Sequence, residues 1–143
     1  MLLDTALAIG IVLKRLRKEQ GFQQADVASY IDASDRTLRN IEHGESGTKT
    51  RTVLKAASEL GLQLYLGQKH GETAITVSCF TDIGRYVQSI RKVQNIRQED
   101  LAAIVGIQHS VLGRLERGDD SVSIGTVFNV LKELGIELNN HKL

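Results

Sequence analysis

Apolar residues recur every three or four positions along most of this chain, in short segments separated by glycine or by polar turns. This spacing is typical of short amphipathic helices. In the second half it predicts helices at about residues 82–93, 98–105, 108–117 and 125–134. The same pattern occurs 74 residues earlier in the first half. The sequence therefore predicts two sets of four helices in tandem.

The two halves are copies of one sequence. Residues 9–66 align with residues 83–140 without a gap, and about 17 of roughly 58 positions are identical. The identical pairs include Arg17/Arg91, Lys18/Lys92, Gln20/Gln94, Gln24/Gln98, Asp26/Asp100, Ala28/Ala102, Leu38/Leu112, Glu42/Glu116 and Gly44/Gly118. Conservative apolar replacements occupy many positions between them, so we interpret the chain as an internal duplication.

After the last helix of each copy the apolar spacing changes from helical to alternating. Residues 62–66 (LQLYL) and 136–139 (IELN) alternate, and residues 73–80 (TAITVSCF) are β-branched with a period of two, which predicts three strands. Residues 67–72 (GQKHGE) are long enough for a hairpin loop and too short to let the copies separate. We expect a small antiparallel sheet where the copies meet, with Cys79 as a small buried core residue.

Composition excludes several classes of protein. A hydrophobic share of 41% and a charged share of 24% are typical of a folded globular domain. No apolar run approaches the ~20 residues that span a bilayer, and the N-terminus lacks the order of a signal peptide. We therefore expect a cytoplasmic protein with no membrane association.

Candidate catalytic and metal-binding chemistry is sparse. One cysteine gives no disulfide framework, and the four histidines show no metal-site spacing. The sequence has no phosphate-binding glycine loop, no GxSxG motif and no paired carboxylates in an evident cleft pattern. We expect no enzymatic activity, no cofactor and no metal. The formal net charge is +1, so any binding of nucleic acid must come from local clusters of charge.

Residues 98–118, QEDLAAIVGIQHSVLGRLERG, form two amphipathic segments hinged at Gly106. Gly106 ends one helix, and the chain turns through Ile107 into the next, which is helix-turn-helix geometry. This stretch resembles the lambda-repressor-like (Xre/Cro) family of DNA-binding domains. The resemblance is carried by Gln98, Leu101, Ala102, Gly106, Ile107, Leu112, Leu115, Glu116, Arg117 and Gly118.

The first copy matches this pattern less closely. Residues 24–44, QADVASYIDASDRTLRNIEHG, carry Asp32 in place of the turn glycine and Ala33 in place of the apolar residue after it. Aspartate tolerates the left-handed conformation better than most residues, so we expect the turn to be kept.

The resemblance implies a mainly α fold of two lambda-repressor-like helical domains in tandem. The endings ELGLQLYL and ELGIELN look like those of HipB-type regulators, in which a strand after the last helix pairs with the same strand of a second subunit. Here both strands lie in one chain, which implies a pseudo-two-fold dimer joined by a small antiparallel β-sheet. We expect domain 1 with its C-terminal strand at residues 1–66, a linker at 67–72, and a strand plus domain 2 with its C-terminal strand at 73–143.

Two identical charged pairs have a structural interpretation under this resemblance. Arg17 and Arg91 fall on the first helix of each copy, and Glu42 and Glu116 end the third helix. A carboxylate that faced phosphates would repel them, so we expect partly buried ion pairs that hold helices together.

The resemblance also implies which residues contact DNA. We expect the base-edge readers to be Asp35, Arg36 and Asn40 in the first copy and His109, Ser110 and Arg114 in the second. We expect contacts to the DNA backbone from Gln24, Ser34, His43, Gln98, Gln108 and Arg117. Lys49 and Arg51 are expected to add phosphate contacts, and Arg39 lies near the same face. Arginine suits guanine and asparagine suits adenine. Asp35 could accept from cytosine or cap the helix beside Ser34, and we favour the cap. Without the turn pattern the same polar residues would be a solvated helix face.

These observations favour a sequence-specific transcriptional regulator, in the form of a repressor, as the function. A helix-turn-helix dimer places two third helices about 34 Å apart in successive major grooves, so the partner is a double-stranded operator with two unequal half-sites. One alternative is a HipB-type antitoxin that also binds a toxin. Another is a protein-binding antiactivator without DNA binding, which Asp32, Asp35 and the low charge favour. The chain would act as a monomeric pseudo-dimer or as a homodimer.

Overall fold

The computed structural model describes residues 1–71 and 73–141. Glu72, the last residue of the expected linker, and residues 142–143, at the end of the expected domain 2, lie outside the described residues. In the first copy the helices are α1 (Ala6–Glu19), α2 (Gln24–Tyr30), α3 (Asp35–Glu42) and α4 (Thr50–Glu59). In the second copy they are α5 (Phe80–Val93), α6 (Gln98–Val105), α7 (His109–Glu116) and α8 (Ile124–Leu134). We call these two bundles head 1 and head 2.

The expected helices are confirmed, and none differs from its expected bounds by more than two residues. The apolar residues of the two heads form one continuous buried core. It includes Leu13 and Leu38 of head 1 and Val87 and Leu112 of head 2. Within each head the first helix packs on the third and the second helix packs on the third. The third helices are thereby fixed by two neighbours each.

The sheet contains β1 (Leu64–Gln68), β2 (Ala74–Val77) and β3 (Ile136–Asn139), in the order β2-β1-β3. Both pairings of β1 are antiparallel, so the expected pairing of the two post-helical strands is confirmed. β1 begins and ends two residues later than the sequence predicted. In the pairing of β1 with β3, Tyr65 lies opposite Asn139, which is its counterpart 74 residues later.

The third expected strand is shorter than residues 73–80. β2 stops at Val77 because the carboxylate of Asp82 accepts hydrogen bonds from the N–H groups of Ser78 and Cys79 and so begins α5. Phe80 is already the first residue of that helix, and Cys79 is exposed. The expected burial of Cys79 is therefore wrong, since alternation was extended past the point where the helix cap takes over.

The first three residues of the chain extend the same sheet at the edge formed by β3. The Leu3 N–H donates to the Leu138 carbonyl at 2.7 Å, and Leu2 bridges Asn139. These two contacts match those of Val77 with Leu64 and of Thr76 with Tyr65, shifted by 74 residues. Each copy is therefore a strand-like segment, four helices and a closing strand. No alternating pattern in the sequence predicts the strand-like segment of head 1.

A second contact joins the heads at the α3–α4 and α7–α8 connections. Lys49 forms a bridge with its counterpart Ser123, 74 residues later. The flanking backbone hydrogen bonds come in pairs related by the same shift. In the first pair, the Thr50 N–H donates to the Val122 carbonyl and the Ile124 N–H donates to the Thr48 carbonyl. In the second pair, the Arg51 N–H donates to the Asp120 carbonyl and the Gly125 N–H donates to the Ser46 carbonyl. The two heads are thus related by an approximate two-fold axis.

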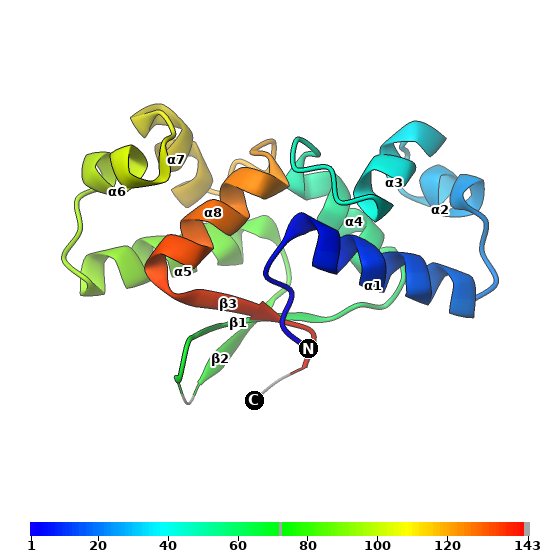
Figure 1. Ribbon diagram of the computed structural model, residues 1–143, viewed down its shortest axis with the longest axis horizontal. Helices are drawn as coiled ribbons and strands as arrows, with labels where there is room; N and C mark the ends of the chain where they lie inside the picture. The colour runs from blue at the N-terminus through cyan, green and yellow to red at the C-terminus, as the bar shows by residue number, and fades with distance from the viewer. Residues whose placement is uncertain (72, 142–143) are drawn as a thin grey trace.

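Figure 1 shows the consequence for the overall shape. The sheet and the N-terminus lie at one side of the molecule, and the two heads lie next to each other above the sheet. Helices α3 and α7 lie toward the opposite side, with the two connecting loops between them. The third helices are therefore neither covered by the strands nor packed on each other.

Candidate nucleic-acid interface

The turns that lead into the two third helices have the same backbone course. Gly106 has φ 86° and Asp32 has φ 56°, so both take the left-handed conformation. After the turn, Ala33 N–H donates to the Ala28 carbonyl at 2.8 Å, and Ile107 N–H donates to that of Ala102 at 3.0 Å. The expectation that aspartate would keep the turn in head 1 is confirmed.

Buried ion pairs fix each third helix to the first helix of its head. The Arg17 guanidinium donates to both carboxylate oxygens of Glu42, at 2.6 and 3.0 Å, and Arg91 does so to Glu116, at 2.7 and 3.0 Å. All four side chains are buried. Burial by itself raises the pKa of Glu42, but hydrogen bonds from Arg17 and Gln24 outweigh it and lower the pKa. The structural role inferred for these pairs is confirmed.

The two glutamines that open the second helices belong to the same networks. The Gln24 amide donates to Glu42 at 2.9 Å, and the Gln98 amide donates to Glu116 at 3.1 Å. The amide oxygen of Gln98 also contacts the His109 ring at 2.7 Å. Sequence reasoning placed both glutamines on phosphates and did not find these bonds. In head 2 the network links the buried ion pair to the first residue of α7.

The other residues expected to contact DNA lie on the third helices or in the loops next to them. The structure leaves these side chains exposed: Ser34, Asp35, Arg36, Arg39, His43 and Lys49 in head 1, and Gln108, His109, Ser110, Arg114 and Arg117 in head 2. Asn40 and Arg51 are half-buried. Because α3 and α7 lie toward the same side of the molecule, both groups belong to one broad surface (Figure 1).

Beside α3 this surface is hollowed by a groove of about 650 Å³. Its lining brings together three of the expected contact residues, Arg36, Asn40 and Lys49, and adds Glu45 from the following loop. Sequence reasoning missed Glu45, because a loop carboxylate carries no motif. The groove therefore presents both signs of charge.

Capping of α3 is done by Ser34. Its hydroxyl accepts a hydrogen bond from the Thr37 N–H at 3.1 Å. Among the described residues, the Asp35 side chain makes no hydrogen bond that would cap the helix. Asp35 therefore contributes only its negative charge in the first turn, where the helix dipole stabilises it.

Two of the expected DNA-contacting arginines are held by carboxylates. Arg114 Nε donates to Asp119 at 3.0 Å, and Arg51 lies 3.9 Å from Asp120 of the other head. Neither aspartate was singled out from the sequence. Both lie in the α7–α8 connection, where they offset part of the positive charge of this surface.

Comparison with known proteins gives matches to both copies. A family model described as Helix-turn-helix matches residues 13–66 and again residues 87–139. An uncharacterised HTH-type transcriptional regulator, y4mF, of Sinorhizobium fredii is 40% identical over 58 residues, which are 41% of this chain and 76% of that protein. Control protein C.SmaI of Serratia marcescens is 35% identical over 60 residues, which are 39% of this chain and 71% of that protein. No solved structure matches.

In both relatives the matched stretch is about the length of one copy and covers most of the protein. The present chain carries that unit twice. Over the residues described, no helix combines the length and the apolar character needed to cross a membrane.

Proposed function

Because this chain belongs to the helix-turn-helix family of transcriptional regulators, we propose that it is a repressor that reads two unequal DNA half-sites with α3 and α7. The observation that carries the proposal is the placement of both third helices toward one side of the molecule, away from the sheet (Figure 1). Helices so placed enter successive major grooves on one face of a duplex.

The approximate two-fold axis defines the shape of the operator. It relates the heads as the subunits of a dimer are related, so the half-sites are inverted repeats about one helical turn apart. The heads present different side chains, Arg36 and Asn40 in one and Ser110 and Arg114 in the other, at matching positions. The half-sites therefore differ in sequence, and one chain acts as a covalent pseudo-dimer whose assembly does not depend on concentration.

Repression follows from occupancy, because a chain bound across two major grooves blocks access to the promoter beneath it. The proposed base readers are Asp35, Arg36 and Asn40 with His109, Ser110 and Arg114. The proposed phosphate contacts come from Ser34, Arg39, His43, Lys49, Arg51, Gln108 and Arg117, with Gln24 and Gln98 beside them.

Selection of bound duplexes from a random-sequence pool tests this function. The wild-type chain should enrich one consensus, and R36A/R114A should lose it while remaining folded. Arg85→Ala is the matched control, since Arg85 is an exposed arginine on α5 rather than on a third helix. A pool that shows no enrichment with the wild-type chain would support the antiactivator alternative instead.

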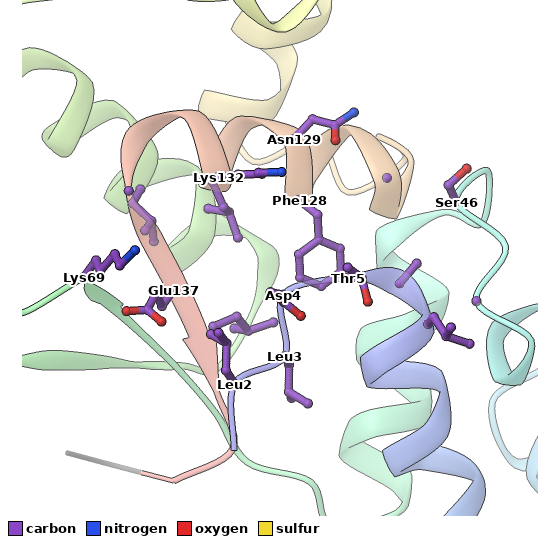
Figure 2. A pocket seen from close by; sticks show the side chains of 18 residues that line it. Leu2, Leu3, Asp4, Thr5, Ser46, Lys69, Phe128, Asn129, Lys132 and Glu137 are labelled. Atoms are coloured by element: carbon purple, nitrogen blue, oxygen red, sulfur yellow. The ribbon is translucent and has the colours of Figure 1, made fainter.

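One observation favours a second candidate, a regulator that also binds a protein partner as an antitoxin does. Leu7 and Ile11 on α1 are each 52% exposed, whereas their counterparts on α5 are Thr81 and Arg85. Leu7 borders a cavity of about 570 Å³ between the N-terminal segment, α1, α8 and β3 (Figure 2). Co-expression with the product of the adjoining gene tests it: a complex that forms with the wild-type chain should be lost in L7D/I11D, with duplex binding unchanged.

A further inference from the structure

Arg114 is held by two neighbouring side chains on the α7–α8 connection. Its Nε donates to Asp119 Oδ2 at 3.0 Å, and its Nη2 donates to the Ser121 hydroxyl oxygen at 3.3 Å. The other carboxylate oxygen of Asp119 accepts from the Ser121 N–H at 3.0 Å and from its hydroxyl at 2.6 Å. The three residues form one closed set of hydrogen bonds on the surface.

These bonds use one edge of the guanidinium and leave another free. A guanidinium carries five N–H donors in a rigid fork. Nε and Nη2 on the side edge are engaged with Asp119 and Ser121, so the end edge, formed by Nη1 and Nη2, keeps its donors for a ligand. A pair of parallel donors of this kind matches O6 and N7 of guanine in the major groove.

We propose that Asp119 and Ser121 are positioning residues that aim the free edge of Arg114 at a guanine in the second half-site. This inference rests on the proposed function. An exposed arginine otherwise loses side-chain entropy when it binds, and fixing it beforehand reduces that loss. The neighbouring carboxylate also weakens the attraction of Arg114 for phosphates, so its contribution shifts from general affinity to discrimination between bases.

The carboxylate of Asp119 is ionised at every pH where such a regulator works. Hydrogen bonds from the Ser121 hydroxyl and N–H, and then from Arg114, lower its pKa from the ordinary aspartate value of 3.8 to about 2. Asp119 therefore accepts the hydrogen bond from Arg114 throughout the neutral pH range.

Head 1 supplies a natural comparison. The positions that match Arg114, Asp119 and Ser121 are Asn40, Glu45 and Gly47. An asparagine needs no carboxylate to orient it, and Gly47 offers no hydroxyl. The aspartate and serine that hold the side chain are thus present only in head 2, where the third helix carries an arginine at this position. This is what we expect if they orient Arg114 to discriminate between bases.

Base preference at the position read by Arg114 tests the inference, measured by selection from a random duplex pool and by competition between duplexes that differ at that one base pair. The wild-type chain should prefer guanine. D119A should reduce that preference at least about fivefold, since a bidentate pair is worth about 1 to 3 kcal/mol of discrimination, and S121A should reduce it less. Affinity for unrelated duplex should stay equal or rise, because a negative charge is removed.

Three variants make the outcome decisive. E19A removes an exposed carboxylate at the end of α1, outside the third helices and their connections, and should leave the guanine preference unchanged. In an R114A background, D119A should have no further effect on base preference. D119N keeps an oxygen acceptor for Nε and should restore part of the preference.

The results distinguish failure of this inference from failure of the proposed function. If D119A leaves the guanine preference intact and only raises affinity for all duplexes, Asp119 merely neutralises charge and the inference is wrong. If the wild-type chain selects no consensus at all, the proposed function fails before this inference is reached.

Discussion

At the scale of single residues, each head contains one buried ion pair, and that pair depends on both of its partners more strictly than any exposed ion pair does. Arg17 and Glu42 are both almost fully removed from solvent, and every donor and acceptor on their facing edges is used. Removing one partner of such a pair leaves a buried charge without compensation, which costs more than the pair itself contributes. These residues therefore hold α1 on α3 and do not read DNA.

Replacement of Glu42 tests this role. E42Q should lower the free energy of unfolding by about 3 kcal/mol, because Arg17 stays buried without a counter-charge. The control E19Q breaks the exposed Arg15–Glu19 pair and should change it by less than about 0.5 kcal/mol. Urea unfolding followed by circular dichroism measures both. Equal effects of the two variants would contradict a structural role for the buried pair.

The same residue gives a pH dependence with a definite sign. The pKa of Glu42 is lower in the folded chain than the ordinary glutamate value of 4.5. Its ionised form therefore stabilises the fold above the unfolded-state pKa, and this contribution is lost as the pH falls through the folded-state pKa. Between about pH 6 and pH 3 the stability of E42Q should fall less than that of the wild-type chain. Parallel acid limbs for the two proteins would show that Glu42 does not titrate as described.

The turn of head 2 depends on one glycine. Gly106 has φ 86°, and a Cβ added there would meet nothing within 4 Å, so only backbone conformation is at stake. G106A should cost about 1 kcal/mol of stability. The control G47A replaces a glycine with ordinary φ and equally open surroundings and should leave stability unchanged or slightly higher. Thermal unfolding of the two variants gives the comparison, and a neutral G106A would rule out this need for glycine.

At the scale of elements, the contact between the first and third helices depends on a missing side chain. A Cβ on Gly84 would lie well inside contact distance of the Leu115 carbonyl oxygen at the end of α7, and Gly10 meets the Ile41 carbonyl in the same way. This close approach brings Arg91 within reach of Glu116. The glycines are identical in the two copies for a steric reason.

Alanine at this contact should force the helices apart. G84A should lower stability by about 2 kcal/mol or more, since adding a methyl group to a tight contact costs about 1 to 3 kcal/mol and outweighs the gain in helix propensity. G113A is a matched control inside α7, where a Cβ would meet only side-chain ends, those of Arg117 and Gln98, and stability should hold or rise. Denaturant midpoints compare them, and a G84A as stable as G113A would contradict the close packing.

The elements themselves could be predicted from the sequence, but only some of the contacts between them could. Apolar periodicity predicted the helices, and the resemblance to lambda-repressor-like domains implied the two buried ion pairs. The Arg114–Asp119 and Gln98–Glu116 bonds depend on rotamers of long polar side chains, which no periodic pattern encodes. Alternation predicts a strand over residues 73–80 that is too long, because helix capping by Asp82 ends the strand at Val77.

At the scale of the whole molecule, helices of the two heads pack on each other, α1 on α8 and α4 on α5 and α8, and backbone hydrogen bonds join the heads at two separate places. One is the pairing of β1 with β3, and the other is the ladder between the α3–α4 and α7–α8 connections. The sequence predicted the first from alternating apolar residues. The second lies in polar loops without a pattern, and the pairing of residues 1–3 with β3 involves too few positions to show the repeat. With both contacts in place, the separation of α3 from α7 is fixed by the fold.

The central claim is that one chain presents two reading helices to successive major grooves of one duplex. Hydroxyl-radical footprinting of the chain on its selected operator, with the stoichiometry measured by native mass spectrometry, tests it most directly. We predict one chain per duplex and two protected regions on the same face, with centres about 10 base pairs apart. A single protected region, two regions on opposite faces, or two chains on each duplex would contradict it.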